Sequence, residues 1–298
     1  MIIAPRTVKL TTRTGIDIQR TLPHRYIRTI GAWCFIDHFG PTEQENAMSV
    51  AAHPHVGLQT VSWLFAGEVE HRDSLGSIQI IHPGELNLMT AGHGIAHSEL
   101  SSTTAGLMHG VQLWTVLPEN ARDGAAYFDH YNDLPVFKKE QLDIRLFVGE
   151  LLGHTSPART FSEMVGAEID VPAGTMAQLP INESYEYGLL VVAGDLRVND
   201  EQVPLEYLYY QPLGSEEFTI ESTGGAKVVL LGGVPFGEEI VMWWNFIGRT
   251  HEEIEEMRFD WESHSNRFPT FEDQVHGRIP APAMPNLRLT PRGNVSPS

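Results

Sequence analysis

Short runs of β-branched and aromatic residues recur along most of the chain, and turns rich in glycine and proline separate them. Two of these turns are Ala66-Gly67-Glu68 and Gly224-Gly225. Runs of this length and composition, bounded by such turns, predict β-strands. Many short strands with frequent turns are typical of β-sandwiches and β-barrels, so the sequence predicts an all-β protein. The predicted strands cover residues 61–65, 78–81, 111–116, 144–148, 164–171, 189–192, 205–210 and 228–231.

One short helix is predicted near the C-terminus. The segment "THEE" at 250–253 matches a capping box, with Thr250 as the N-cap residue and Glu253 three positions later. The apolar residues Ile254, Met257 and Trp261 then fall on one face of a helix. The tail after about residue 268 is rich in proline and has no regular pattern. We therefore expect an extended arm or a loose end there rather than another folded unit.

The strand pattern occurs twice along the chain. The stretch "VSWLFAGEVEHRDSLGSIQIIHPGEL" resembles "GLLVVAGDLRVNDEQVPLEYLYYQPL", since each has an apolar strand, Ala-Gly, an acidic residue, a hairpin, a second strand and a proline turn. We predict two β-barrel domains, at residues 1–130 and 131–298, with the boundary in the polar stretch between about 118 and 137. An ungapped alignment of Gly67 with Gly194 places His53 opposite Pro180, His55 opposite Asn182 and Gln59 opposite Glu186.

Composition and charge narrow the classes of function. The chain has 298 residues, of which 42% are hydrophobic and 19% charged, as in packed globular proteins. Its 38 acidic and 20 basic residues give a net charge of −18, which repels phosphate and anionic lipid, so we expect no direct nucleic-acid binding. The single cysteine, Cys34, excludes an intrachain disulfide. Neither a signal-peptide core nor an apolar run of transmembrane length is present, and we expect a cytoplasmic monomer.

Two pairs of residues with metal-ligating side chains occur in the first half. The first is His53-x-His55; with 14 histidines in the chain, about one such pair is expected by chance. The second, His97-x-Glu99, has the same spacing. Residues i and i+2 of a strand point to one face, so two such strands facing each other in a small barrel would supply three imidazoles and one carboxylate. The second copy of the repeat lacks both histidines, so only the first domain is predicted to bind metal.

The kinds of ligand limit the choice of ion. Three imidazole nitrogens and one carboxylate oxygen suit Fe(II), Mn(II), Ni(II), Cu(II) or Zn(II). On an octahedral ion, four protein ligands leave two positions open for a bidentate substrate, or for substrate and dioxygen. Cys34 lies outside both motifs, which argues against a thiolate-bound structural zinc. Pro54 cannot donate to a strand ladder, and this predicts an edge strand or a bend at the first pair.

Taken together, the motifs resemble the pirin family of the cupin superfamily. The resemblance rests on "HPHVGLQTVSWLFAGEVEHRDSLGS", "HPGELNLMTAGHGIAHSE", "MHGVQLWTVLP" and "GAWCFIDHFGP", and more loosely on "VPFGEEIVMWWNFIGRTHEEI". It implies a bicupin fold with a short C-terminal helix and one metal ion, Fe(II), in the N-terminal barrel. By motif position, it implies His53, His55, His97 and Glu99 as the ligands. Many cupins have a glutamate in place of Gln59; here the resemblance assigns the carboxylate to Glu99, and Gln59 could still act around the ligands or in an acid–base step.

The resemblance implies two main kinds of function. The first is a quercetin 2,3-dioxygenase, which opens a small aromatic, flavonol-like compound with O2 and releases carbon monoxide. Glu99, or a group around it, would accept the proton of the substrate hydroxyl. The second is an iron-dependent, redox-sensitive regulator that binds a transcription factor or a metabolic enzyme, with an acidic surface toward a basic protein partner. A structural metal protein is a third reading, disfavoured because closed structural sites lack open positions. All three need the same ligands, so the sequence leaves the question of an enzyme open.

Other residues have weaker claims to the site. His93 is a candidate for the rim of the metal cavity, and His109 and Gln112 are candidates for its wall. The segment 71–73, "HRD", is interpreted as a turn and ion-pair feature. The remaining candidates are expected to serve packing: Met89, Trp63 and Trp114 in the barrel core, and Trp243 and Trp244 between domains.

Overall fold

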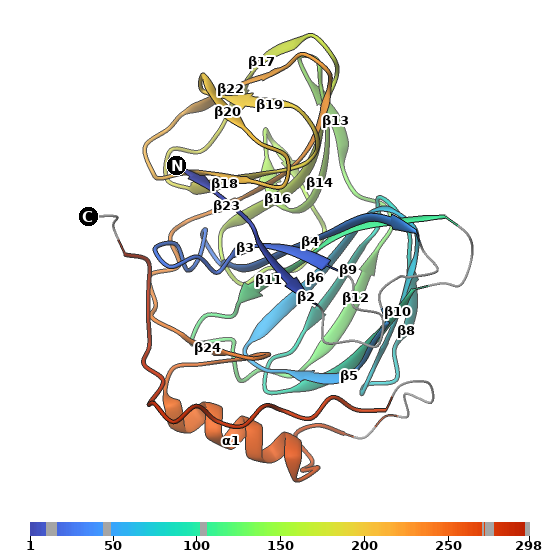
Figure 1. Cartoon of the computed structure of the whole chain (residues 1–298), viewed down its shortest axis with the longest axis vertical. Coiled ribbons are helices and arrows are strands. Elements are labelled where there is room, and N and C mark those ends of the chain that lie inside the picture. The colour runs from blue at the N-terminus through green and yellow to red at the C-terminus, as the bar shows by residue number, and fades with distance from the viewer. Residues whose placement is uncertain (10–16, 44–48, 102–105, 270, 272–276, 296–298) are drawn as a thin grey trace. The chain divides into compact units, whose positions relative to one another are not determined.

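The computed structural model describes residues 1–298 except 10–16, 44–48, 102–105, 270, 272–276 and 296–298. The described chain is mostly β-strand, with one helix near the C-terminus (Figure 1). The strands of the first half are β1 (Ile2–Ile3), β2 (Arg6–Lys9), β3 (Asp17–Leu22), β4 (Trp33–Glu43), β5 (Ser49–His55), β6 (Leu58–Ala66), β7 (Val69–Asp73), β8 (Ile78–Ile81), β9 (Leu86–Thr90), β10 (Ile95–Ser101), β11 (Leu107–Val116) and β12 (Tyr127–Tyr131). The later elements are β13 (Val136–Lys139), β14 (Leu142–Leu151), β15 (His154–Thr155), β16 (Met164–Val171), β17 (Thr175–Pro180), β18 (Glu186–Gly194), β19 (Leu196–Val198), β20 (Glu201–Val203), β21 (Leu208–Gln211), β22 (Glu217–Ser222), β23 (Ala226–Gly233), β24 (Val241–Trp243), β25 (Phe246–Gly248) and α1 (His251–Glu262).

Each predicted strand segment overlaps an observed strand, so the prediction of an all-β fold with a short C-terminal helix is confirmed. The segment 205–210 is the least accurate, because β21 begins only at Leu208. Before it, the chain turns: Glu206 has φ 69°, and the Tyr207 N–H donates to the Pro204 carbonyl at 3.1 Å. In the part of the chain that the structure describes, no helix is long and apolar enough to cross a membrane.

Packing divides the chain into two compact units, each assembled from three segments. We call one the histidine unit; it comprises Val8–Ile18, Phe39–His130 and Gly237–Ser298. The other unit comprises Met1–Thr7, Gln19–His38 and Tyr131–Phe236. The helix and the tail therefore belong to the histidine unit. The domain limits 1–130 and 131–298 stay a prediction.

The two units repeat one arrangement of strands. The four-stranded sheet of the histidine unit has the order β5-β10-β7-β8, and its counterpart in the other unit has the order β17-β22-β19-β20. The larger sheets run β12-β9-β6-β11-β4-β3-β2 and β1-β21-β18-β23-β16-β14-β13, so β9-β6-β11 corresponds to β21-β18-β23. The predicted repeat of two barrel-like domains is thus confirmed. The described strand orders are linear, and each predicted barrel is therefore built from open sheets.

Helix α1 begins and buries its apolar face as predicted. Thr250 is the N-cap residue, and its Oγ1 accepts the Glu253 N–H at 3.2 Å. The Glu253 carboxylate accepts the N–H of Arg249 at 2.7 Å, one residue before the position that a full capping box uses. The buried residues of the helix are Ile254, Met257 and Trp261.

The described part of the C-terminal tail runs along α1 (Figure 1). Trp261 Nε1 donates to the Ile279 carbonyl at 2.9 Å, and Arg288 pairs with Glu252 of the helix at 2.5 Å. Backbone bonds also tie the tail to β5, since the Ile279 N–H donates to the Ala52 carbonyl at 2.8 Å. Of the two predicted alternatives, the described tail is therefore an extended arm, bound to the histidine unit.

A buried carboxylate occupies the first position of β18, opposite Gln59 in the repeat. Glu186 is 4% exposed; its Oε1 accepts the Gly31 N–H at 2.7 Å, and its Oε2 accepts the Tyr210 hydroxyl at 2.8 Å. Burial raises the pKa of Glu186 above its ordinary value of 4.5, although the hydrogen bonds from Tyr210 and Gly31 oppose that rise. The Glu186 carboxylate thus joins β18 to the segment at Gly31 and to Tyr210 of β21, but it requires a charged group to be buried.

Replacing Glu186 with glutamine should therefore not weaken the fold at neutral pH. Glutamine can accept from Gly31 and donate to Tyr210 without a charge, whereas Glu186→Ala leaves both groups unpaired and should cost about 1–3 kcal/mol. A carboxyl whose folded pKa is raised loses relative stability as pH rises from the unfolded value through the folded one. The advantage of Glu186→Gln over wild type should thus grow between pH 4 and 7. Urea unfolding at both pH values measures it, and a glutamine variant weaker than wild type at pH 7 would contradict the account.

Candidate metal centre

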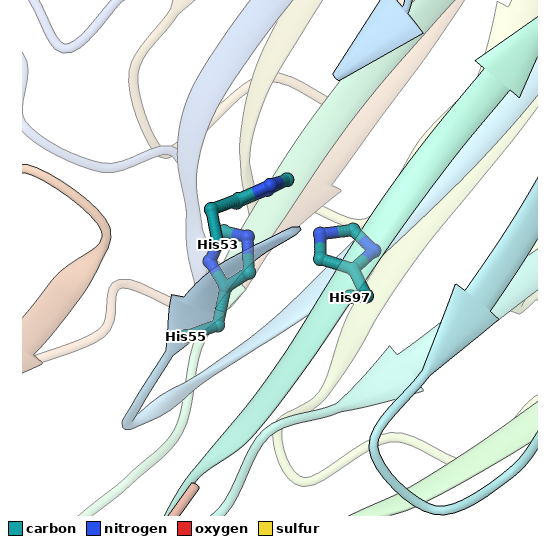
Figure 2. A group of neighbouring side chains, drawn as sticks. All are labelled: His53, His55 and His97. Atoms are coloured by element: carbon teal, nitrogen blue, oxygen red, sulfur yellow. The ribbon is translucent and has the colours of Figure 1, made fainter. Parts of the chain in front are cut away.

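Three histidines from two neighbouring strands converge on one point in the histidine unit (Figure 2). His53 and His55 lie two apart on β5, and His97 of β10 pairs across the ladder with His53. Each residue offers one ring nitrogen, and these three atoms lie within 4.8 Å of one another. Strand β5 is at the edge of its sheet, as the presence of Pro54 predicted. Proline has no N–H to donate, and an edge strand tolerates this because one of its sides has no partner in the sheet.

The free nitrogens of these rings suit a metal ion. His53 Nδ1 lies 2.9 Å from the Ala51 carbonyl, which leaves Nε2 for another partner. His97 Nε2 and His55 Nδ1 are buried and have no hydrogen-bond partner among the described residues. Buried nitrogens without partners are costly in a folded protein. A bound transition metal ion would satisfy them, so the residues present fit the ion that the motifs predict.

The environment keeps the three imidazoles neutral. Burial lowers the pKa of His53 to about 4, although the hydrogen bond to the Ala51 carbonyl acts in the opposite direction. Burial, and then the neighbouring histidines, lower the pKa values of His55 and His97 well below the ordinary 6.5. A histidine binds metal only through a neutral ring, so no proton has to be displaced from the free nitrogens at pH 7.

Glu99 is buried on the same strand as His97, but its carboxylate lies outside the three-histidine group of the described chain. The Ser62 hydroxyl, on β6 of the facing sheet, lies 3.3 Å from Glu99 Oε1 and 2.9 Å from Gln112 Oε1. Burial raises the pKa of Glu99, and the neighbouring His71 and the hydrogen bond from the Ser62 hydroxyl act in the opposite direction. Glu99 as the fourth ligand stays a prediction.

A second pair of polar side chains lies behind His97. Strand β7 pairs with β10 so that Asp73 is opposite His97 and His71 is opposite Glu99. His71 Nδ1 lies 3.3 Å from His97 Nδ1, and His71 Nε2 lies 3.1 Å from Asp73 Oδ2. Burial alone would raise the pKa of Asp73, but the hydrogen bonds from His71 and Ser77 outweigh it and lower that pKa. The pair is therefore a buried contact between an imidazole and a carboxylate.

The ion pair predicted in segment 71–73 is present, but its place beside the metal centre was not predicted. The signal was present, since His71-x-Asp73 repeats the two-residue spacing of His53-x-His55. Arg72, between them, pairs with Glu70 at 2.6 Å on the other face of β7. The contact between His71 and His97 depends on the register between β7 and β10. The sequence of one strand does not predict that register.

Gln59 lies on the face of its strand away from the centre. Its amide donates to Thr90 Oγ1 at 2.9 Å and accepts from Thr115 Oγ1 at 3.2 Å. The next residue of each strand points the opposite way. Trp114, which precedes Thr115 on β11, has its ring 5.1 Å from that of His55. Gln59 thus joins three strands through its amide, and a role for it around the ligands stays a prediction.

The weaker candidates for the site, and the residues expected to serve packing, lie at several places in the histidine unit. His93 is exposed, and its described bonds are made by its backbone, to Gly124 and to Arg267. His109 is buried with its ring 4.8 Å from Phe65. Trp63 and Met89 are buried in the histidine unit, as predicted. Trp243 and Trp244 pack around Phe246 beside α1, within the histidine unit, so the prediction that they pack between domains is wrong.

Comparison with known proteins agrees with this arrangement. The chain matches a family model described as Pirin over residues 15–115, and one described as Pirin C-terminal cupin domain over residues 166–268. A protein of Pseudomonas aeruginosa, provisionally named a quercetin 2,3-dioxygenase, is 43% identical over 91% of this chain and 87% of its own length. A pirin-like protein of Caulobacter vibrioides is 33% identical over 90% of this chain and 95% of its own.

A solved structure extends the likeness to the whole fold. The crystal structure of a quercetin 2,3-dioxygenase from Acinetobacter baumannii is 40% identical and has a TM-score of 0.93, over 97% of each chain. The repeated strand order, the three converging histidines and these matches together show that the chain belongs to the pirin family.

Proposed function

We propose that the chain is a mononuclear iron dioxygenase of the quercetin 2,3-dioxygenase type. The observation that carries this proposal is the group of three neutral, buried imidazoles whose free nitrogens converge within 4.8 Å. The named activities of the relatives from Pseudomonas aeruginosa and Acinetobacter baumannii support the choice of reaction. The substrate would be a flavonol or another small aromatic compound with an acidic hydroxyl.

The ligands of the proposed centre are His53, His55, His97 and Glu99. Three nitrogens and one oxygen suit Fe(II), which also brings the redox chemistry that O2 requires. When bound, the ion would supply a Lewis acid and a redox centre. Glu99 is two residues from His97 on β10, and its Oε1 lies 3.3 Å from the Ser62 hydroxyl.

The chain's own residues would orient the substrate and move its proton. The Glu99 carboxylate is buried beside the centre and would accept the proton of the substrate hydroxyl. Ser62 and Gln112 would hold that carboxylate in position through the hydroxyl that contacts both. The ring of Trp114 packs edge-on against His55 and would fix that imidazole while excluding water.

The proposal is tested by anaerobic reconstitution with Fe(II), followed by addition of quercetin and O2. We expect oxygen uptake with equimolar release of carbon monoxide, and no reaction above background in a metal-free His97→Ala variant. Glu99→Gln should lower turnover about 100-fold if the carboxylate accepts the proton. Iron-loaded wild type that consumes no more oxygen than His97→Ala would overturn the enzyme proposal and favour the regulator. The cytoplasmic location and the monomeric state stay predictions.

A further inference from the structure

We propose that Asp73 and His71 act as positioning residues, which fix the tautomer and orientation of His97 and so set how tightly the centre holds its metal ion. This inference rests on the metal centre of the proposed function. It does not require that the protein turn over quercetin. Two contacts connect these residues in a line: Asp73 to His71, and His71 to His97.

The carboxylate of Asp73 is fixed first. Its Oδ1 lies 2.9 Å from the Leu75 nitrogen and 3.0 Å from the Ser77 nitrogen, both of which donate to it at the end of β7. These two bonds leave Oδ2 facing His71 Nε2 at 3.1 Å. An ionised carboxylate can only accept hydrogen bonds, so the hydrogen of this link belongs to His71 Nε2.

The tautomer of His97 follows from that of His71. With the hydrogen of His71 on Nε2, toward Asp73, the Nδ1 atom of His71 is the acceptor of the next link, and it faces His97 Nδ1 at 3.3 Å. One of the two facing nitrogens must donate, and only His97 can. His97 therefore has its hydrogen on Nδ1 and its lone pair on Nε2, which is the buried nitrogen without a partner among the described residues.

The surroundings keep this line rigid and define its role. The His71 ring stacks on Phe128, with ring centroids 4.3 Å apart and an interplanar angle of 14°. Both nitrogens of His71 are engaged, so His71 has no lone pair to offer the ion. For comparison, His53 is oriented by a backbone carbonyl, that of Ala51. The His97 line is made of side chains, and substitution can therefore test it.

Asp73→Asn should reverse the direction of both hydrogen bonds in this line. The backbone donors of Leu75 and Ser77 would hold the amide oxygen, so the amide NH2 would face His71 Nε2 and donate to it. His71 would then carry its hydrogen on Nδ1 and donate to His97, which moves the hydrogen of His97 onto Nε2. The ion would have to displace that hydrogen. Loss of an outer partner of a metal-bound histidine lowers metal affinity about 10–100-fold.

The experiment measures Co(II) and Fe(II) affinity by chelator competition, and the midpoint potential of the bound iron, in full-length protein. We expect Asp73→Asn and His71→Phe each to weaken binding of both ions about 10–100-fold and to shift the potential upward, because His97 loses electron donation. His71→Phe keeps the stacked shape but has no ring nitrogen. In that background Asp73→Asn should have no further effect on affinity. Arg72→Gln, between the two on the opposite face of β7, is the matched control and should match wild type.

The outcomes separate this inference from the proposed function. If wild type itself binds neither ion, the metal centre of the proposed function fails, and this inference with it. If wild type binds the ions and folded Asp73→Asn has the same affinities and potential, only the positioning role is overturned. An additive loss in the double variant would also overturn it, since Asp73 would then act by another route. Circular dichroism confirms folding, and Asp73→Asn, which is nearly isosteric, serves if His71→Phe does not fold.

Discussion

His97→Ala is expected to reduce the metal content of the reconstituted protein from near one equivalent to below about a tenth. His97 is the only ligand in the three-histidine group that comes from β10, and its removal leaves two imidazoles on one edge strand. With the proposed ligand Glu99, only three of the four groups would then remain, and β10 would offer no nitrogen to the ion. The expected loss exceeds the 10–100-fold change that outer partners produce. Elemental analysis after anaerobic loading with Fe(II) and removal of free metal measures it.

His93→Ala is the matched control for this experiment. His93 is four residues earlier on the same segment, is exposed, and makes its described bonds through backbone atoms that alanine keeps. We expect wild-type metal content in this variant. Equal metal content in His97→Ala and wild type, with both folded, would show that the ion is held elsewhere. Parallel loss in both variants would point to a general effect on the fold.

Gly149→Ala is expected to destabilise the protein by about 3–5 kcal/mol, at the upper end of single substitutions. Gly149 lies in β14 with φ +77°, where a side chain already costs about 1–2 kcal/mol. In addition, a Cβ there would lie 1.7 Å from the Met164 carbonyl oxygen, far inside van der Waals contact. The obstacle is backbone of the paired strand β16, so it cannot swing aside as a side chain would. Thermal unfolding followed by circular dichroism measures the effect.

Gly153 provides an internal reference for the conformational part of that cost. Its φ of +78° is nearly the same, and a Cβ there meets nothing within 4 Å. Gly153→Ala should therefore be destabilised only by the left-handed backbone conformation, which lowers the free energy of unfolding by about 1–2 kcal/mol. The difference between the two variants isolates the clash with β16. Similar melting temperatures for both would mean that the strand pair relaxes around the added methyl group.

The strands and the helix could be predicted because their signals are local. Period, turn residues and the N-cap at Thr250 all act within a few residues, and the structure places strands or helix wherever they occur together. The errors also have local causes. Strand β21 starts late because Glu206 adopts a turn conformation, and the Glu253 carboxylate bonds to Arg249 instead of the N-cap. Residue type and spacing do not predict which of two local conformations or two hydrogen-bond partners a residue adopts.

The candidate site could be predicted only in part, because it depends on how strands pair. The spacing of two puts His53 and His55 on one face, and it does the same for His97 and Glu99. The same spacing at His71-x-Asp73 was available, but nothing local distinguishes a pair beside the centre from a pair at a surface. Gln59 shows the converse: its motif position suggested a role near the ligands, while the pleat of β6 turns it to the opposite face.

By itself, the sequence determined that this protein is all-β, that its strand pattern is repeated, that one copy carries the histidines, and that it resembles the pirins. These properties follow from residue type and spacing, which act over a few positions. Only the tertiary structure decided that β10 pairs with β5 on one side and with β7 on the other. That register joins three distant segments at His97. It is set by the burial of whole strand faces rather than by any one motif, because a shift of one residue would turn every side chain of a strand to the other face.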